Sequence, residues 1–158
     1  MHLDLQQSMR KFADAQAVDL REASRFTPVD FRLGVQWLVT QNNMDLAQAL
    51  AEAGLALYPK SEDILAISAL LAEIQQDWTT AEDMLRKLVE TQGDAATPFT
   101  WRHLIRVLRC QCEPGKAMLA AQQALAQHPQ DDLLREELLS LQDLVSDQLP
   151  VEASRQMH

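Results

Sequence analysis

Apolar residues recur three and four residues apart along most of the chain, with no sustained alternation of period two. This spacing is typical of helices that bury one face. Prolines mark the boundaries between these segments, since proline is tolerated in the first helical turn and disfavoured inside a helix. Thr27-Pro28 and Thr97-Pro98 each read as an N-cap followed by proline at the first helical position.

The pattern predicts an all-α protein. We expect a long N-terminal helix over about 3–24 and a last helix over about 130–147, followed by a frayed tail over 150–158. Between them lie three pairs of helices, at about 28–41 and 44–57, 61–76 and 78–91, and 97–111 and 114–127.

The composition is that of a globular helical protein, and the net charge argues against some classes of partner. Hydrophobic residues make up 47% and aromatic residues 5% of the 158 residues, and helix-forming Ala and Leu dominate. The net charge of −9 argues against nucleic acid or anionic lipid as a partner. No run of apolar residues is long enough to span a membrane, and no signal-peptide core is present, so we expect a cytoplasmic protein without membrane insertion.

An alanine recurs at one position of each pair. Ala47, Ala81 and Ala117 are almost evenly spaced, and the second interval is the longer by two residues, which fall in the 93–97 loop. Small or apolar residues surround each alanine at matching positions, and only Ser68 departs from this rule. They are Phe31, Gly34, Val35, Leu38, Ala51, Gly54 and Leu55; Leu65, Ala69, Ala72, Leu85, Leu88 and Val89; and Trp101, Leu104, Ile105, Leu108, Ala121, Ala124 and Leu125.

In these positions the chain resembles the tetratricopeptide repeat, a 34-residue unit of two antiparallel helices. The interval from Ala47 to Ala81 equals the length of that unit. The repeats are degenerate, because most of the aromatic residues usual in the family are Leu or Ala here and Gly93 replaces one proline. The resemblance implies a right-handed superhelix of antiparallel hairpins. It predicts one domain over 1–149, with repeats at about 28–61, 62–95 and 98–131 between two capping helices.

The family's first helices line a concave groove, so the resemblance also nominates binding residues. Transferred by register, they are Arg32, Gln36, Val39, Leu70, Phe99, Arg102, Arg106 and Arg109, with His103 alongside. The residues of the family's clamp for acidic chaperone tails are mostly absent, so that form of recognition is rejected.

Three of these residues form an arginine stripe. Arg102, Arg106 and Arg109 are spaced four and three apart, so they share one face of a helix. Arginine binds carboxylates through two parallel hydrogen bonds, which suggests a peptide with acidic groups. The alternative is a solvated face neutralised by Glu136, Glu137 or Asp143 on the next helix.

No residues point to catalysis, a cofactor or a metal. The chain has no phosphate-binding glycine loop and no Gly-flanked nucleophilic serine. Cys110 and Cys112 form a single Cys-x-Cys near His103, which lacks the further ligands of a zinc site.

The leading hypothesis is therefore a non-enzymatic adaptor that binds a segment of a protein partner. A bacterial type III secretion chaperone is the main alternative, and a helical RNA-binding repeat a distant one. The N-terminal helix carries an apolar face of Leu5, Met9, Phe12, Ala13, Ala17 and Leu20. We interpret it as a cap over the first repeat, or else as an arm that forms a homodimer or fills the groove.

Overall fold

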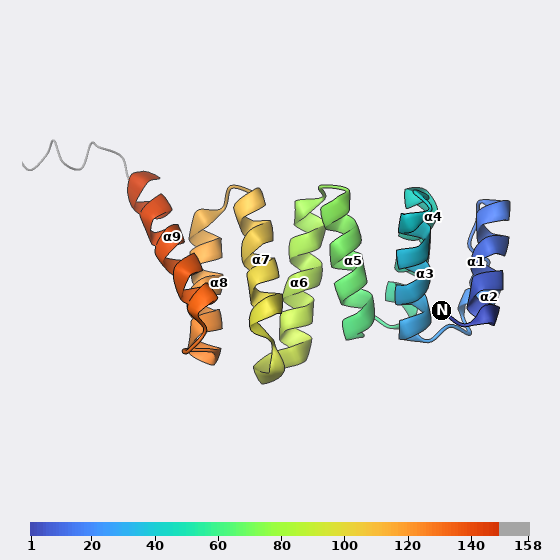
Figure 1. The fold of residues 1–158 in the computed structure, drawn as a ribbon, viewed down its shortest axis with the longest axis horizontal. Coiled ribbons are helices and arrows are strands. Elements are labelled where there is room, and N and C mark those ends of the chain that lie inside the picture. The colour runs from blue at the N-terminus through green and yellow to red at the C-terminus, as the bar shows by residue number, and fades with distance from the viewer. Residues whose placement is uncertain (149–158) are drawn as a thin grey trace, which may run out of the picture. The chain divides into compact units, whose positions relative to one another are not determined.

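Helices, and no strands, form the regular structure of the part of the chain described, residues 1–148 of a computed structural model. The frayed tail expected over 150–158 lies outside these residues. The predicted pairs are present as α3 (Pro28–Thr40) with α4 (Met44–Leu57), α5 (Glu62–Ile74) with α6 (Trp78–Gln92), and α7 (Pro98–Cys110) with α8 (Pro114–Gln127). α9 (Asp132–Gln148) follows (Figure 1). The all-α, tetratricopeptide-like architecture is confirmed.

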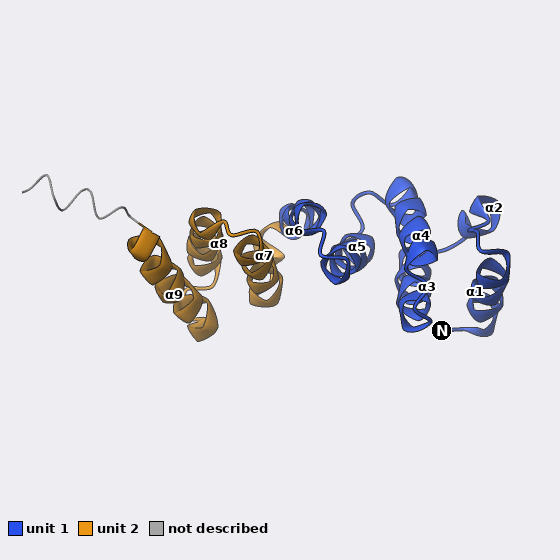
Figure 2. Ribbon diagram, turned by 90° about the horizontal axis from the view of Figure 1, so that it is seen from above, with its two compact units in different colours: residues 1–92 blue, residues 93–158 orange. Residues whose placement is uncertain are grey.

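The chain divides into two compact units, residues 1–92 and 93–158 (Figure 2). In the first unit, α3 packs against α4 and α5, and α5 packs against α6. In the second unit, α8 packs against both α7 and α9. The boundary falls where Gly93 replaces a repeat proline and begins the short 3-10 helix η1 (Gly93–Ala95) with a φ of 56°. The single domain over 1–149 stays a prediction.

The repeated alanines are buried in all three hairpins. Ala47, Ala81 and Ala117 are each 0% exposed. Of the eight small or apolar positions chosen from the sequence, seven are buried in every repeat, and the last, Leu55, Val89 or Leu125, is half-buried. The register taken from the sequence therefore matches the core. A small side chain such as alanine lets neighbouring helices approach closely, where a larger one would overpack the hairpin.

The three hairpins share one turn. Asn42, Gln76 and Cys112 have φ values of 57°, 58° and 58°, and each follows the last residues of a first helix. In each case the next backbone N–H donates to a carbonyl in the last turn of that helix, as Asp77 does to Ala72 at 2.8 Å. This is the Schellman arrangement, which satisfies carbonyls that would otherwise lack a donor.

The N-terminal segment corrects one expectation. The single helix over 3–24 is two helices, α1 (Leu3–Ala15) and α2 (Leu20–Ala23). The chain turns at Gln16, which has a left-handed φ of 50°, and the Asp19 side chain then caps α2 by accepting from the N–H groups of Arg21 and Glu22. This reversal brings Phe12 within 6.1 Å of Phe26, measured between ring centroids.

The apolar face of α1 is turned inward. Leu5, Met9 and Phe12 are at most 1% exposed, and α1 packs against α3, whereas Ala17 and Leu20 are exposed. A Cβ placed on Gly34 of α3 would lie 2.9 Å from the Met9 sulfur, which shows how closely the two helices approach. The α1 part of the expected apolar face therefore covers α3, as a capping helix does, and the homodimer stays a prediction.

Candidate functional site

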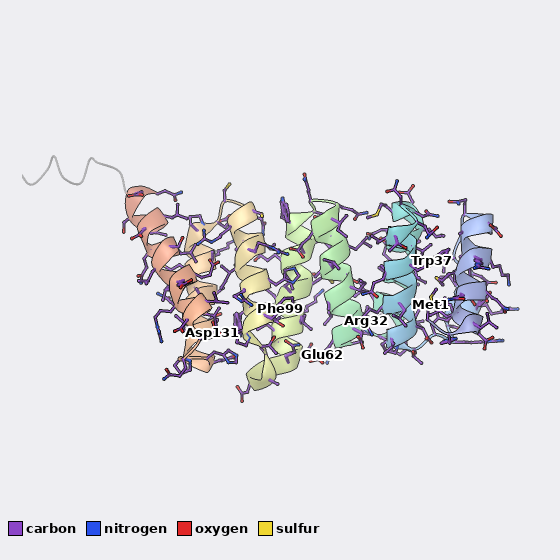
Figure 3. All side chains as sticks on the ribbon, viewed as in Figure 1. Met1, Arg32, Trp37, Glu62, Phe99 and Asp131 are labelled. Atoms are coloured by element: carbon purple, nitrogen blue, oxygen red, sulfur yellow. The ribbon has the colours of Figure 1, made fainter. Side chains whose placement is uncertain are left out.

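Helix α7 has one buried and one open face. Its N-terminus is fixed by Thr97, whose side chain accepts from the Thr100 N–H, and by Pro98 in the first turn. Trp101, Leu104, Ile105 and Leu108 are buried. Phe99 and the arginine stripe lie on the opposite face of the helix. Figure 3 labels Phe99, which belongs to the first turn of α7.

A hollow of about 560 Å³ lies between this open face and α9. The residues that line it come from two helices of the same unit. They are Phe99, Arg102, His103, Arg106 and Arg109 on α7, and Leu133, Glu136, Glu137 and Ser140 on α9. All five α7 residues predicted from the sequence are therefore brought together.

One arginine of the stripe is paired within the unit. A terminal guanidinium nitrogen of Arg109 lies 3.1 Å from the Glu137 carboxylate and donates to the Ser140 hydroxyl at 3.0 Å. The contact with Glu137 is an ion pair without the alignment of a hydrogen bond. Because both side chains are partly exposed, such a pair contributes only about 0–1 kcal/mol. A competing carboxylate can therefore displace it at little cost.

Arg102 differs from Arg109 in its partners. The Nε atoms of both are buried without an acceptor, but Arg102 also has no hydrogen-bond or ion-pair partner through its terminal nitrogens within residues 1–148. A buried donor without an acceptor carries a desolvation cost that a ligand oxygen would remove. Glu137 thus neutralises Arg109, as one of the two alternatives drawn from the sequence expected, whereas no carboxylate within residues 1–148 pairs with Arg102.

Apolar side chains border one end of the hollow. Phe99 is 70% exposed, and its ring centroid lies 6.0 Å from that of His103. Leu133 on α9 is 49% exposed. Large apolar groups with charges beside them suit a protein segment better than a small ion, because aromatic residues and arginine are the usual energetic centres of protein interfaces.

The other predicted residues lie in the first unit. Gln36, Val39 and Leu70 line a second hollow of about 220 Å³ between α3 and α5, with Ile67 and Ile74. Arg32 does not line this hollow, and its guanidinium forms an ion pair with Asp63 of α5 at 2.9 Å. The expected set of nine residues therefore falls into two hollows and one ion pair.

Sequence reasoning missed the α9 wall as a source of binding residues. Leu133, Glu136 and Ser140 follow Phe99, Arg102 and Arg106, respectively, by one repeat length. Continuing the repeat register by one more unit would have found them. α9 is thus the first helix of a further repeat as well as the helix that covers α8.

Neither cysteines nor acidic residues form a metal centre in the described part of the chain. Cys110 and Cys112 are both free and exposed. No group of three or more His, Cys, Asp or Glu side chains is placed to hold a metal ion among residues 1–148. No helix within that range is long and apolar enough to cross a membrane.

Comparison with known proteins agrees with the resemblance to the tetratricopeptide repeat. No curated protein matches the chain. The family model described as tetratricopeptide repeat matches residues 5–147, which include the three hairpins from α3 to α8 and all of α9 but its last residue. Repeats of this family mediate interactions between proteins, and they are typically not enzymes. The chain belongs to the tetratricopeptide repeat family.

Proposed function

We propose that this protein is a non-enzymatic adaptor that binds a segment of a partner protein in the α7–α9 hollow. One observation carries the proposal: Arg102 lines an open hollow with its Nε buried and without a partner in residues 1–148. A carboxylate of the partner would accept from this guanidinium, and charge-assisted hydrogen bonds are the stronger kind.

The surroundings of Arg102 support a protein ligand. Phe99 and Leu133 offer exposed apolar surface at the same hollow, and Arg109 is held only by a partly exposed ion pair. The apolar surface can pack against a side chain of the partner, and the arginines can select a segment that carries hydrogen-bond acceptors. Ligand sites generally combine apolar surface with a few polar groups in this way. The predicted binding residues on α7 keep their role in this proposal.

The test is capture of partners from the source cell with wild-type protein and two variants. Arg102→Gln removes the cation from the hollow. Arg135→Gln is the control: it removes an arginine of α9 that does not line the hollow and that pairs with Asp132. We expect a protein retained by wild type and by Arg135→Gln to be lost with Arg102→Gln, and purified components to reproduce the difference. Equal retention by all three would overturn the proposal.

A second candidate, a chaperone that shields an apolar segment of a client, is favoured by the hollow between α3 and α5. Its lining is almost wholly apolar, and Leu70 and Ile74, one helical turn apart, are 41% and 50% exposed. We expect a chaperone's client to be lost from a Leu70→Ser/Ile74→Ser double variant and retained by Arg102→Gln. A partner that is lost with Arg102→Gln and retained by the Leu70→Ser/Ile74→Ser variant supports the adaptor.

A further inference from the structure

The two walls of the α7–α9 hollow carry opposite charges. The α7 wall contributes Arg102, Arg106 and Arg109, and the α9 wall contributes Glu136 and Glu137. Arg109 and Glu137 are joined across the hollow as an ion pair. A ligand that carried only carboxylates would meet repulsion from the α9 wall, because like charges at close range cost free energy.

Arg102 and Glu136 are the two opposite charges that remain open. Arg102 has a buried Nε without an acceptor, and Glu136 is exposed on the other wall. Neither forms a hydrogen bond or ion pair, with the other or with any other residue, in the described chain. They occupy the same position of successive repeats, so the fold places a cation and a carboxylate at one level of the hollow.

An apolar pair lies at the next level. Phe99 and Leu133 are also separated by one repeat length, and each precedes its charged neighbour by three residues on the same helix. Three residues of helix rise by about 4.5 Å. An extended chain advances about 3.3 Å per residue, so one to two residues of an extended segment separate the two levels.

We infer that the hollow takes an extended partner segment in which an acidic and a basic residue are neighbours beside a bulky apolar residue. The inference rests on the proposed function and names the chemistry of its partner. In an extended segment, successive side chains point to opposite sides. The acidic side chain therefore reaches Arg102 on α7 while the basic one reaches Glu136 on α9, and the apolar side chain packs on Phe99 and Leu133.

The two ionic contacts involve different pairs of side chains. Each lies on its own wall and uses a different side chain of the ligand, so each can be removed by its own variant of the protein and its own replacement in the ligand.

Blocked seven-residue peptides test the inference. The central three residues are one apolar, one acidic and one basic residue in every order, with Gly and Ser on both sides. Two further sets carry Gln in place of the acidic or the basic residue. Dissociation constants are measured by NMR titration against wild type, Arg102→Gln, Glu136→Gln and the control Arg135→Gln.

For wild type and the control, we expect each Gln replacement in the best peptide to weaken binding by about tenfold, the effect of one charge-assisted hydrogen bond. Against Arg102→Gln, replacing the acidic residue should cause no further loss. Against Glu136→Gln, replacing the basic residue should cause no further loss. Urea denaturation of each variant checks that the fold is intact, because the Arg102 side chain is half-buried.

Three results would overturn the inference. The basic residue could prove dispensable for wild type, which would identify a site for acidic segments alone and leave the adaptor function standing. Free glutamate and lysine could bind as tightly as the peptides, which would identify a small-molecule site. Binding of the captured partner could depend on Arg102 but not on Glu136, which would also identify a site for acidic segments alone and leave the adaptor function standing. The adaptor function itself fails only if capture is insensitive to Arg102→Gln.

Discussion

The Tyr58 hydroxyl donates a hydrogen bond of 2.8 Å to the backbone carbonyl of Phe26. The bond ties the end of α4 to the residue before the N-cap of α3, and so closes the first hairpin. His128 repeats the arrangement in the second unit, with its Nε2 at 2.6 Å from the carbonyl of Ala96. The sequence separation is the same in both pairs, and both side chains stand immediately before a proline. Tyrosine and histidine thus perform the same structural task at one repeat position.

Tyr58→Phe should lower the free energy of unfolding by about 1 kcal/mol, the net value of one intramolecular hydrogen bond. The phenylalanine ring keeps the edge contact with Phe31, whose centroid lies 6.1 Å from that of Tyr58. Tyr58→Leu, which also loses that contact, should cost more. Urea denaturation followed by circular dichroism measures both, and a Tyr58→Phe variant as stable as wild type would show that the hydrogen bond contributes nothing.

Gln76→Gly should stabilise the first unit by about 0.5–1 kcal/mol, because Gln76 has a φ of 58°, a conformation that costs a residue with a Cβ free energy and costs glycine little. Gln75→Gly is the matched control, because Gln75 has a φ of −83° and should only lose stability on substitution. Equal effects of the two substitutions on the thermal midpoint would contradict this account of the turn.

Gly54→Val should destabilise the protein by about 1–3 kcal/mol through overpacking. A Cβ at Gly54 would lie 3.0 Å from the Ile64 Cδ1 and 3.2 Å from the Phe31 ring. The Phe31 ring is fully buried, and its centroid lies 5.5 Å from that of Phe26, so moving it aside would cost packing free energy. The same change at Gly115, where a Cβ meets nothing within 4 Å, should be neutral or slightly stabilising. Calorimetry compares the pair, and similar losses at both sites would point to helix propensity instead.

Stability should fall in acid partly through Glu22. Its carboxylate accepts from the Ser8 hydroxyl at 2.6 Å and from the Lys11 ammonium at 3.0 Å. The hydrogen bond from Ser8, and then that from Lys11, lower the pKa of Glu22 below its usual 4.5. The folded state therefore favours the carboxylate, and its stabilisation is complete above the unfolded pKa and lost as pH falls through the folded pKa.

Ser8→Ala should reduce the stability lost between about pH 7 and about pH 3, because the two pKa values then lie closer together. Glu22→Gln, which does not titrate, should reduce that loss further. Urea midpoints at both pH values measure the effect. Parallel pH profiles for wild type and both variants would exclude Glu22 as a source of the acid sensitivity.

Local signals in the sequence determined the helical hairpins. The ends of α3, α4, α7 and α8 lie within one or two residues of those predicted. N-caps such as Thr27 and Thr97 act over three or four residues, and the repeated alanines are buried in each hairpin. The break between α1 and α2 was not predicted, because neither proline nor glycine stands at Gln16. Asp19, a favourable N-cap residue, is the signal in the sequence that could have indicated the start of α2.

The sequence by itself also determined that the arginine stripe shares one face of α7, since helical periodicity alone places those residues. Only the tertiary structure decided which arginine is paired and which is open. That outcome depends on how α9 lies across the hollow, and so on packing between segments that are distant in the sequence. The position of Glu137 against Arg109 at 3.1 Å, with Glu136 one residue away and unpaired in the described chain, follows from that packing. Periodicity fixes the face of a helix, but the burial of α9 against α8 fixes which side chains meet across the hollow.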